Sequence, residues 1–250
     1  MEITMKDGEI YGTRIIDLAL QIDENLIIAD LHLGYENALI NEGILIPKFQ
    51  YRKITNRLEK IFHAANSYCH VKRIVINGDL KHEFGRSSRQ EYEETHRFIN
   101  FLKNYADEIV LIRGNHDNFV MTITENSNVK FCENFTIKNF FILHGDKIPE
   151  NFDNLAKNKV VVIAHEHPCV GLRTSERTEK MKCFLNGNFE GKNLIVIPAF
   201  NFITEGTDVL QGNLLSPFLK NNIENFGVIG VENFEIFYFG NVRDLINLNI

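Results

Sequence analysis

Continuous apolar runs alternate with helically spaced apolar positions in the first half of the chain. Runs of this kind are typical of strands buried on both faces. They predict strands at four segments: 15–22, 26–29, 73–77 and 108–112. Apolar and aromatic residues recur every three or four positions over 49–67 and 89–105, which predicts two amphipathic helices. The first half therefore reads as a βαβαβ unit.

The second half of the chain has more extended segments and fewer helical ones. It predicts short strands at these segments: 129–131, 136–138, 140–143, 160–164, 194–198, 227–230 and 234–239. Segment 207–225 carries no chemical signature, and we expect a surface loop with a short helix that borders the pocket. The two halves together predict an α/β fold of two packed mixed β-sheets flanked by helices, within one domain spanning residues 1–250.

Composition excludes several classes of protein. A length of 250 residues, 44% hydrophobic and 24% charged, suits one globular domain. The net charge of −6 argues against strong general affinity for nucleic acid, but it does not exclude a local basic groove. The first 30 residues lack the apolar core of a secretion signal, and no run of about 18 apolar residues predicts a membrane span. Four cysteines without a C-x-x-C pair indicate reduced thiols in a cytoplasmic protein.

Polar residues suited to metal binding follow five of the predicted strands. The five loops read D-L-H-L-G, G-D-L-K-H, G-N-H-D, H-G-D and H-E-H in chain order. Six of the nine histidines lie in them: His32, His82, His116, His144, His165 and His167. Sites in open α/β sheets form beyond the carboxyl ends of strands. We therefore expect the five loops to meet.

Each motif taken alone has an ordinary explanation. Asp30 could cap a helix, and Gly78-Asp79 could form a plain turn. His144 could be a loop histidine, and His165 and His167 could be a chance pair in a polar loop. All five motifs in this order, each directly after a strand, make chance an improbable explanation.

The types of residue in these loops indicate a metal. Carboxylate, imidazole and amide ligands together suit Mn²⁺, Fe or Zn²⁺ better than Ca²⁺ or Mg²⁺ alone. The loops also hold more candidate ligands than one tetrahedral ion uses. Two divalent ions about 3.5–4 Å apart, bridged by one carboxylate, fit this number and are typical of phosphoester hydrolysis.

The ordered series D-x-H, G-D, G-N-H-D, H and H-x-H resembles the calcineurin-like metallophosphoesterase superfamily, from about Leu26 to His167. D-L-H-L-G with G-D-L-x-H is similar to the DNA repair nucleases of the SbcD type. The runs GYENALINEGILIP and IPAFNFITEG are similar to SbcD-related or DNA ligase-associated phosphoesterases and extend the likeness to about Gly206. The resemblance implies a four-layer metallophosphoesterase sandwich without the DNA-binding cap of the repair nucleases.

The resemblance also implies two metal sites that share one carboxylate, with Mn²⁺ as the expected ion. The first set of ligands is Asp30, His32, Asp79 and His167. The second set is Asp79, Asn115, His144 and His165, so that Asp79 bridges. A hydroxide bridging the two ions would attack phosphorus. Two further histidines would be catalytic: His116 would protonate the leaving-group oxygen, and His82 would contact the substrate phosphate.

Two residues of the H-x-H motif differ from the family pattern. Ala164 stands where the family has glycine, and this change is too small to disturb metal ligation. Glu166 lies between the two histidines and could restrict the substrate. The roles of two residues near the G-N-H-D motif have two interpretations each. Asp117 could orient His116 or cap the following turn, and Arg113 could bind phosphate or flank its strand on the solvent side.

The aromatic pair Phe200 and Phe202 could stack on a base or pack in the core.

His82 and the family resemblance favour a phosphodiesterase that acts on single-stranded nucleic acid or on nucleotides. The acidic charge and the lack of a Lys/Arg-rich run speak against it. A phosphomonoesterase or pyrophosphohydrolase of a small metabolite would use the same chemistry. A non-catalytic adaptor is a third alternative, against which the intact ligand set speaks. The resemblance leaves a homodimer open, because the repair nucleases dimerise.

Overall fold

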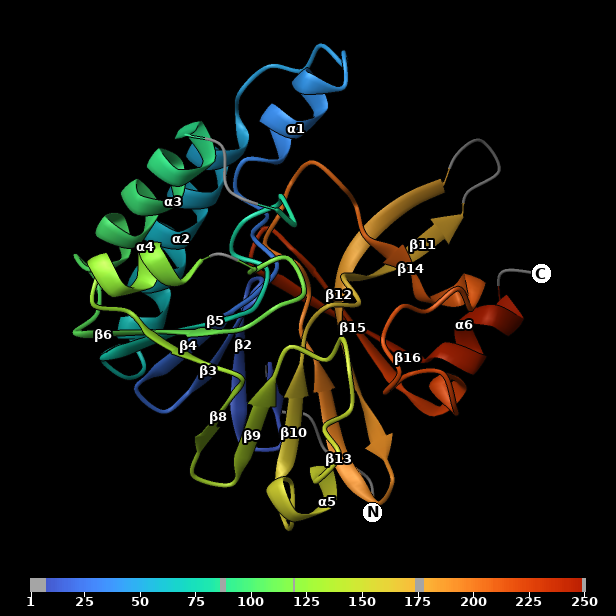
Figure 1. Cartoon of the computed structure of the whole chain (residues 1–250). Coiled ribbons are helices and arrows are strands. Elements are labelled where there is room, and N and C mark those ends of the chain that lie inside the picture. The colour runs from blue at the N-terminus through green and yellow to red at the C-terminus, as the bar shows by residue number, and fades with distance from the viewer. Residues whose placement is uncertain (1–7, 86–88, 119, 174–177, 249–250) are drawn as a thin grey trace.

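Two β-sheets pack face to face in the computed structural model, which describes residues 8–85, 89–118, 120–173 and 178–248 (Figure 1). The first sheet has seven strands in chain order: β1 (Glu9–Ile10), β2 (Thr13–Ile16), β3 (Ala19–Ile22), β4 (Asn25–Ile28), β5 (Arg73–Asn77), β6 (Glu108–Ile112) and β7 (Lys130–Cys132). Its first four strands pair antiparallel, whereas β4, β5, β6 and β7 run parallel.

The second sheet has nine strands and is mixed. Seven of them lie in the order β14 (Thr207–Asp208), β11 (Pro168–Arg173), β12 (Thr178–Phe189), β13 (Lys192–Val196), β10 (Val160–Ile163), β9 (Phe140–Leu143) and β8 (Asn134–Ile137). The long strand β12 also pairs with β15 (Gly227–Glu232), which pairs in turn with β16 (Glu235–Asn241). Strand β10 is parallel to both of its neighbours, β9 and β13.

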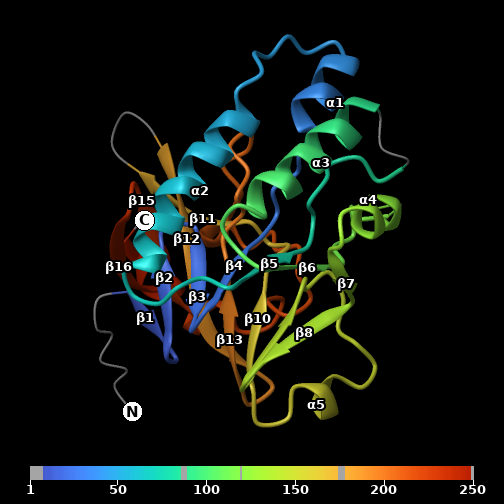
Figure 2. The same cartoon turned by 90° about the vertical axis from the view of Figure 1, so that its left-hand side faces the viewer.

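Helices cover the outer faces of both sheets and complete four layers. Beside the first sheet lie α2 (Gln50–Asn66), α3 (Arg89–Leu102) and α4 (Met121–Asn126), as Figure 2 shows. Ile54, Leu58 and Ile61 of α2 are fully buried, because their helical spacing aims one apolar face at the sheet. On the second sheet lie α5 (Phe152–Leu155), α6 (Val242–Leu248) and two 3₁₀ turns, Val209–Gln211 and Ile223–Asn225. Helix α1 (Tyr35–Asn41) extends away from the sheets at the top of Figure 1.

The sequence predicted this fold correctly in its main features. Two packed mixed sheets flanked by helices are confirmed, and the strands 73–77, 108–112 and 140–143 have the predicted bounds. The single strand predicted over 15–22 is wrong. It is a hairpin of β2 and β3 that reverses at Asp17, whose φ is 55°. Asp17 is the polar residue in this run that tolerates such a turn, and the strand prediction passed over it. Strand β11 is a short apolar run directly after the H-x-H motif, and β12 begins with the largely charged run T-E-K-M-K, so neither was predicted.

Segment 207–225 is more than the predicted surface loop with a short helix. It contains strand β14 and both 3₁₀ turns, and Phe218 and Leu219 within it are fully buried against the second sheet. No helix in the described ranges is both long enough and apolar enough to cross a membrane.

Candidate metal centre

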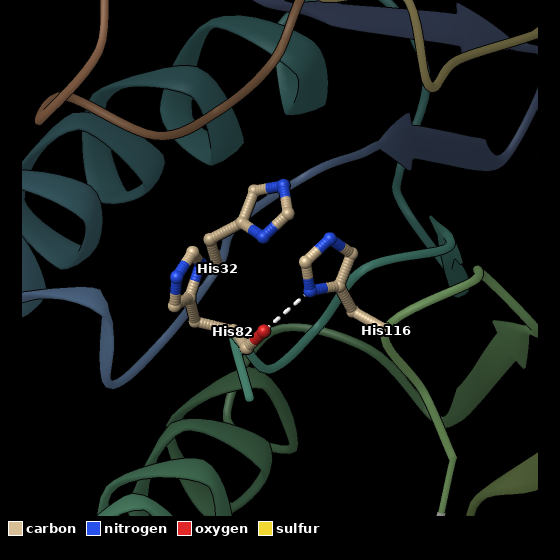
Figure 3. Close-up of side chains that lie close together, drawn as sticks. All are labelled: His32, His82 and His116. Carbon is tan, nitrogen blue, oxygen red and sulfur yellow. Dashed lines mark hydrogen bonds between the residues drawn. The ribbon is translucent and has the colours of Figure 1, made fainter. Parts of the chain in front are cut away.

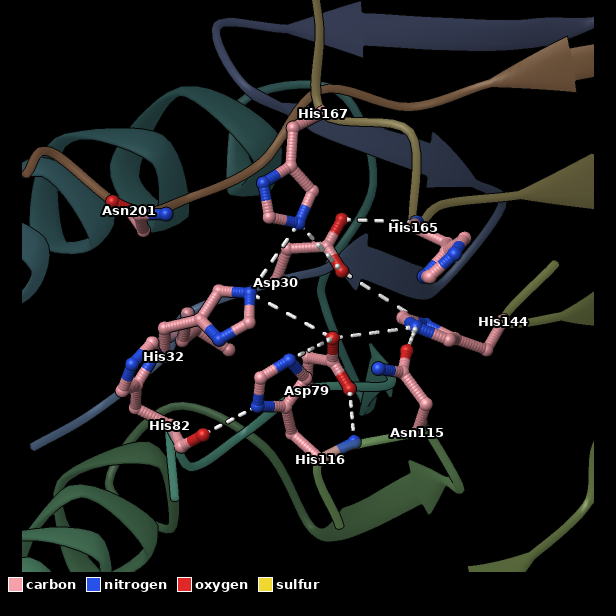
Figure 4. A network of polar contacts seen from close by, with 12 residues as sticks. Asp30, His32, Asp79, His82, Asn115, His116, His144, His165, His167 and Asn201 are labelled. Atoms are coloured by element: carbon pink, nitrogen blue, oxygen red, sulfur yellow. Dashed lines mark hydrogen bonds and ion pairs between the residues drawn. The ribbon is translucent and has the colours of Figure 1, made fainter. Parts of the chain in front are cut away.

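The carboxyl ends of five strands face one edge where the two sheets meet. Strands β4, β5 and β6 are parallel neighbours, and so are β9 and β10. The loops that follow these strands gather the predicted ligands in one cluster (Figure 4). Asp30, His32, Asp79 and Asn115 come from the first sheet, and His144, His165 and His167 from the second. The structure thus brings together all seven residues predicted to hold metal.

The first predicted ligand set forms one compact group of donor atoms. The ligand atoms of Asp30, His32, Asp79 and His167 all lie within 4.8 Å of one another. His167 Nε2 lies 3.4 Å from Asp30 Oδ1 and 3.3 Å from His32 Nε2. His32 Nε2 lies 3.7 Å from Asp79 Oδ2. Two carboxylates and two imidazoles therefore converge on one point.

The second predicted set lies beside the first and shares Asp79 with it. Asp79, His144 and His165 also place their ligand atoms within 4.8 Å of one another. His144 Nε2 lies 3.4 Å from Asp79 Oδ2 and 3.1 Å from Asn115 Oδ1. The other ring nitrogen, Nδ1, donates to the Asn77 carbonyl at 3.0 Å, so Nε2 is the atom that faces the centre. Burial lowers the pKa of His144, but the facing carboxylates, chiefly that of Asp79, raise it to about 10, and a bound metal ion would take the place of the Nε2 proton.

These donor sets fit divalent metal ions on their own geometry. Asp30 Oδ1 and His32 Nδ1 are buried without a hydrogen-bond partner among the described residues. The two Nε2 atoms of His32 and His167 face each other, although at most one can donate to the other. A cation between these lone pairs would satisfy both nitrogens and the carboxylate oxygen.

The backbone at the centre is strained. Five predicted ligands adopt a positive φ: Asp30 (52°), His32 (46°), Asp79 (52°), His165 (65°) and His167 (51°). Residues other than glycine rarely adopt this backbone conformation, which typically costs ~1–3 kcal/mol for each of them. Ten other non-glycine residues of the described chain also have a positive φ, but only at this centre do five such residues meet, and such a group of strained residues is typical of a functional site.

Two glycines allow the loops to approach each other closely. A Cβ atom on Gly78 would lie 2.1 Å from His144 Nδ1, and one on Gly114 would lie 2.2 Å from Asp79 Oδ1. Both distances are far inside van der Waals contact, so any side chain at these positions would displace a predicted ligand. The glycines of the G-D and G-N-H-D motifs are therefore needed for packing.

Burial and the facing charges set the protonation of the cluster. Burial raises the pKa of Asp79, but the charge of His144 and its hydrogen bond to this carboxylate more than offset the effect, so the pKa lies below its usual range. Asp30 behaves in the same way, with His167 as its main partner. Burial lowers the pKa of His32 to about 3, so its imidazole is neutral and available as a ligand at neutral pH.

The two histidines predicted to be catalytic border the centre (Figure 3). His32, His82 and His116 form a third group, with ring centroids 4.8–5.5 Å apart. His116 Nδ1 is hydrogen-bonded to the His82 carbonyl oxygen, and His116 Nε2 lies 4.0 Å from Asp79 Oδ2. The Nε2 atom thus faces the same point as the predicted ligands. Burial lowers the pKa of His82 to about 4, which leaves a neutral ring.

The contacts of Asp117 and Arg113 decide between the two interpretations that the sequence left open for each. The Asp117 carboxylate accepts hydrogen bonds from the backbone N–H groups of Asp79 (2.8 Å), Leu80 (3.0 Å) and Gly114 (2.9 Å). It therefore caps its own turn and fastens it to the G-D loop. Arg113 lies on the surface, 3.2 Å from Glu133 Oε1, which is the flanking position.

The expectation that Glu166 restricts the substrate is wrong. This side chain is fully buried, so a substrate in solution does not reach it. Its Oε2 accepts hydrogen bonds from the backbone N–H groups of Leu215 (2.9 Å) and Ser216 (2.8 Å). Glu166 thus fastens the H-x-H loop to segment 207–225, a contact across about fifty positions that no local pattern reveals.

The structure places several residues at the site that the sequence motifs did not indicate. The Tyr35 ring stacks on His82 at 3.8 Å between centroids, and the half-exposed Phe84 ring stacks on His116 at 3.7 Å. The buried Gln50 side chain donates to the carbonyl oxygens of Leu31 (3.1 Å) and His32 (3.0 Å). Tyr35 and Phe84 lie within three residues of motif histidines, which was the available signal, whereas Gln50 is a long-range contact.

The fold and this centre define a phosphoesterase that depends on divalent metals. The sequence model of the calcineurin-like phosphoesterase family matches residues 26–223, and the chain belongs to that family. It is accordingly a hydrolase of phosphoester bonds. No curated protein matches the chain.

A search of solved structures finds matches at low sequence identity. The nuclease MPE of Pseudomonas putida is 19% identical, with 87% of this chain and 91% of that chain covered and a TM-score of 0.57. The phosphoesterase Yfce of E. coli is 15% identical, with 88% and 93% covered and a TM-score of 0.38. At this identity the nuclease supports the fold alone.

Proposed function

We propose that this protein is a dinuclear metal-dependent phosphodiesterase that acts on nucleic acid or nucleotides. The observation that carries the proposal is the convergence of seven candidate ligands on two adjacent points that share Asp79, with His116 Nε2 facing them. Asp30, His32, Asp79 and His167 would hold one ion, and Asp79, Asn115, His144 and His165 the other. Mn²⁺ is the ion we propose, because carboxylate, amide and imidazole ligands suit it.

When bound, the two ions would supply a hydroxide near neutral pH and neutralise charge on the phosphoryl oxygens. The protein's own residues would do the rest. His116 keeps its Nδ1 on the His82 carbonyl, so its Nε2 is the atom that would give a proton to the leaving oxygen. Asp117 would hold the loop that carries Asn115 and His116 in place through the three backbone N–H groups it accepts from.

The surroundings of the centre and the family both support a diester as the substrate. In the part of the chain that the structure describes, the basic side chains within 4.0 Å of the carboxylates of Asp30 and Asp79 are histidines. Burial lowers the pKa of His82 to about 4, so its ring is neutral at pH 7 and would contact the substrate phosphate through a hydrogen bond. This position of His82 beside His32 and His116, with the family to which the chain belongs, is what favours a phosphodiesterase.

The test is hydrolysis of bis-p-nitrophenyl phosphate beside p-nitrophenyl phosphate, both with Mn²⁺. We expect faster turnover of the diester, and none after a chelator removes the metal. A preference for the monoester would replace this proposal by a phosphatase of small metabolites. Two bound metals without activity on either ester would favour the non-catalytic adaptor.

The homodimer and the cytoplasmic location stay predictions. The molar mass of the metal-loaded protein in solution, from light scattering, tests the first.

A further inference from the structure

Segment 200–207 forms one border of the predicted metal centre, and we call it the border segment. At its start, Phe200 N donates to the carbonyl oxygen of Ala29 at 2.8 Å, directly before Asp30. At its end, Thr207 N donates to the carbonyl oxygen of His167 at 2.9 Å. Asn201 of this segment lies beside the cluster in Figure 4. The border segment thus runs from one predicted ligand to another.

Two lysines contact the border segment from different layers. Lys182 of β12 places its Nζ 3.5 Å from the carbonyl oxygen of Thr204. Lys53 of α2 places its Nζ 4.7 Å from the centroid of the Phe202 ring. Phe200 is fully buried in the core. Phe202 is partly exposed, and its ring faces the ammonium group of Lys53.

Neither lysine has a carboxylate within 4.0 Å among the residues that the structure describes. Their cationic neighbours differ in this respect. Arg57 forms two hydrogen bonds to Asp17, at 2.7 and 2.8 Å, and Lys180 lies 3.9 Å from Glu205. Lys53 and Lys182 are therefore the cations at this border whose charge is not neutralised.

Lys182 is partly buried, and its charge is costly for that reason. Burial is the largest cause that lowers the pKa of Lys182, and the charges of Lys53 and Arg57 act in the same direction. Cys169 and the carboxylate of Asp30 oppose them, and the resulting pKa is about 8. The charges of Lys53, Arg57 and Asp30 are thus close enough to Lys182 to act on its pKa. A cation held away from water without an acid is stabilised when an anion joins it.

We propose that Lys53 and Lys182 form a binding subsite for a second phosphate group of the substrate, next to the one that is cleaved. The inference rests on the proposed function and narrows its substrate class. Ammonium groups form strong charge-assisted hydrogen bonds to phosphate oxygens. A nucleic-acid strand and a nucleoside diphosphate both carry a second phosphate, whereas a simple ester with one phosphate does not.

The test measures binding of a fluorescein-labelled ten-nucleotide oligothymidylate, with phosphorothioate linkages that resist hydrolysis, to the Mn²⁺-loaded protein by fluorescence anisotropy. We expect the double variant Lys53→Ala/Lys182→Ala to bind at least about tenfold more weakly than wild type, with a shallower salt dependence. Lys60→Ala removes an exposed charge of the same helix and should bind as wild type does. Lys182→Arg keeps the charge and should retain most of the affinity, which separates lost charge from misfolding.

Equal affinity of wild type and the double variant would overturn the subsite, and so would a wild type that does not bind. Unlabelled oligothymidylate and ADP as competitors distinguish the two sources of phosphate, by which of them displaces the probe at lower concentration.

Hydrolysis rates distinguish failure of the proposed function from failure of the subsite. In the double variant, the ratio of kcat/KM for the oligonucleotide to that for bis-p-nitrophenyl phosphate should fall by about tenfold. An unchanged ratio contradicts the subsite. A wild type inactive on both substrates contradicts the proposed function, while the binding experiment still decides the subsite.

Discussion

Asp79 is the residue on which both predicted metal positions depend. Its Oδ2 lies 3.7 Å from His32 Nε2 in one ligand set and 3.4 Å from His144 Nε2 in the other. Its Oδ1 accepts a hydrogen bond from the backbone N–H of His116 at 2.9 Å, so one carboxylate also positions the proposed acid.

Replacement of Asp79 by Asn should remove metal from both positions, because an amide offers one weaker oxygen where the carboxylate bridges. Metal content per chain, measured by mass spectrometry after dialysis against Mn²⁺, checks this. Asp153→Asn is the matched control, since Asp153 pairs with Lys192 on the surface. Full occupancy in the Asp79 variant would refute the ligand assignment.

Replacement of His116 by Asn should leave the metal content intact and reduce turnover of bis-p-nitrophenyl phosphate by roughly 10²–10⁴-fold, the usual scale for an acid–base group. His63→Asn, on the exposed side of α2, should keep wild-type turnover. If the His116 variant also turned over at the wild-type rate, His116 would have no part in proton transfer.

Oligonucleotide binding should weaken as the pH rises through about 8, because Lys182 loses its proton there. The groups that act on it are Asp30, Lys53, Arg57 and Cys169. Burial raises the pKa of Cys169 to about 11, so this thiol does not change charge in that range. Anisotropy titrations on either side of pH 8 test the effect. Lys182→Arg should lose this pH dependence, because arginine stays charged; the same dependence in that variant would assign it to another group.

At the scale of elements, buried polar side chains fasten the site loops to distant segments. Glu166 accepts hydrogen bonds from two backbone N–H groups of segment 207–225, and Ser216 Oγ in that segment donates to the Gly145 carbonyl at 2.8 Å. The loops that carry His144, His165 and His167 therefore share one support.

Replacement of Glu166 by Ala should lower the free energy of unfolding by ~1–3 kcal/mol, because the buried N–H of Ser216 and the partly buried N–H of Leu215 lose their acceptor. Amide hydrogen exchange at Leu215 and Ser216 should speed up in the same variant. Glu166→Gln keeps an acceptor oxygen and should recover most of both effects. Wild-type exchange rates in the alanine variant would show that other contacts hold this segment.

At the scale of the whole molecule, the predicted metal centre joins the two sheets. His32 and Asp79 follow strands of the first sheet, and His144 and His167 follow strands of the second. Ions bound here would link the two layers, so metal binding and folding should be coupled.

Mn²⁺ should raise the Tm of the wild-type protein, by an amount that corresponds to about 2.7 kcal/mol at a hundredfold excess over Kd. Calorimetry with Mn²⁺ and with chelator measures this, and Asp79→Asn should show no shift. One cooperative transition is expected for a single domain, and two separate transitions would contradict the domain prediction.

Much of the fold and of the candidate site was readable from local sequence. Strand runs such as 73–77 and 140–143 carry their signal within five residues, and the polar motifs follow them directly. The hairpin reversal at Asp17 was missed because one polar residue inside an apolar run is a weak turn signal. Strand β12 was missed because it begins with a largely charged run, and with it the pairing of β11.

The sequence by itself determined which residues have metal-binding chemistry and that they follow strands, because both depend on short-range patterns. Only the tertiary structure decided how they meet. His32 and His167 face each other across 135 positions, Glu166 holds a segment instead of restricting a substrate, and two lysines from different layers gather at one border. Contacts at such separations depend on how the two sheets pack, and no local pattern encodes that packing.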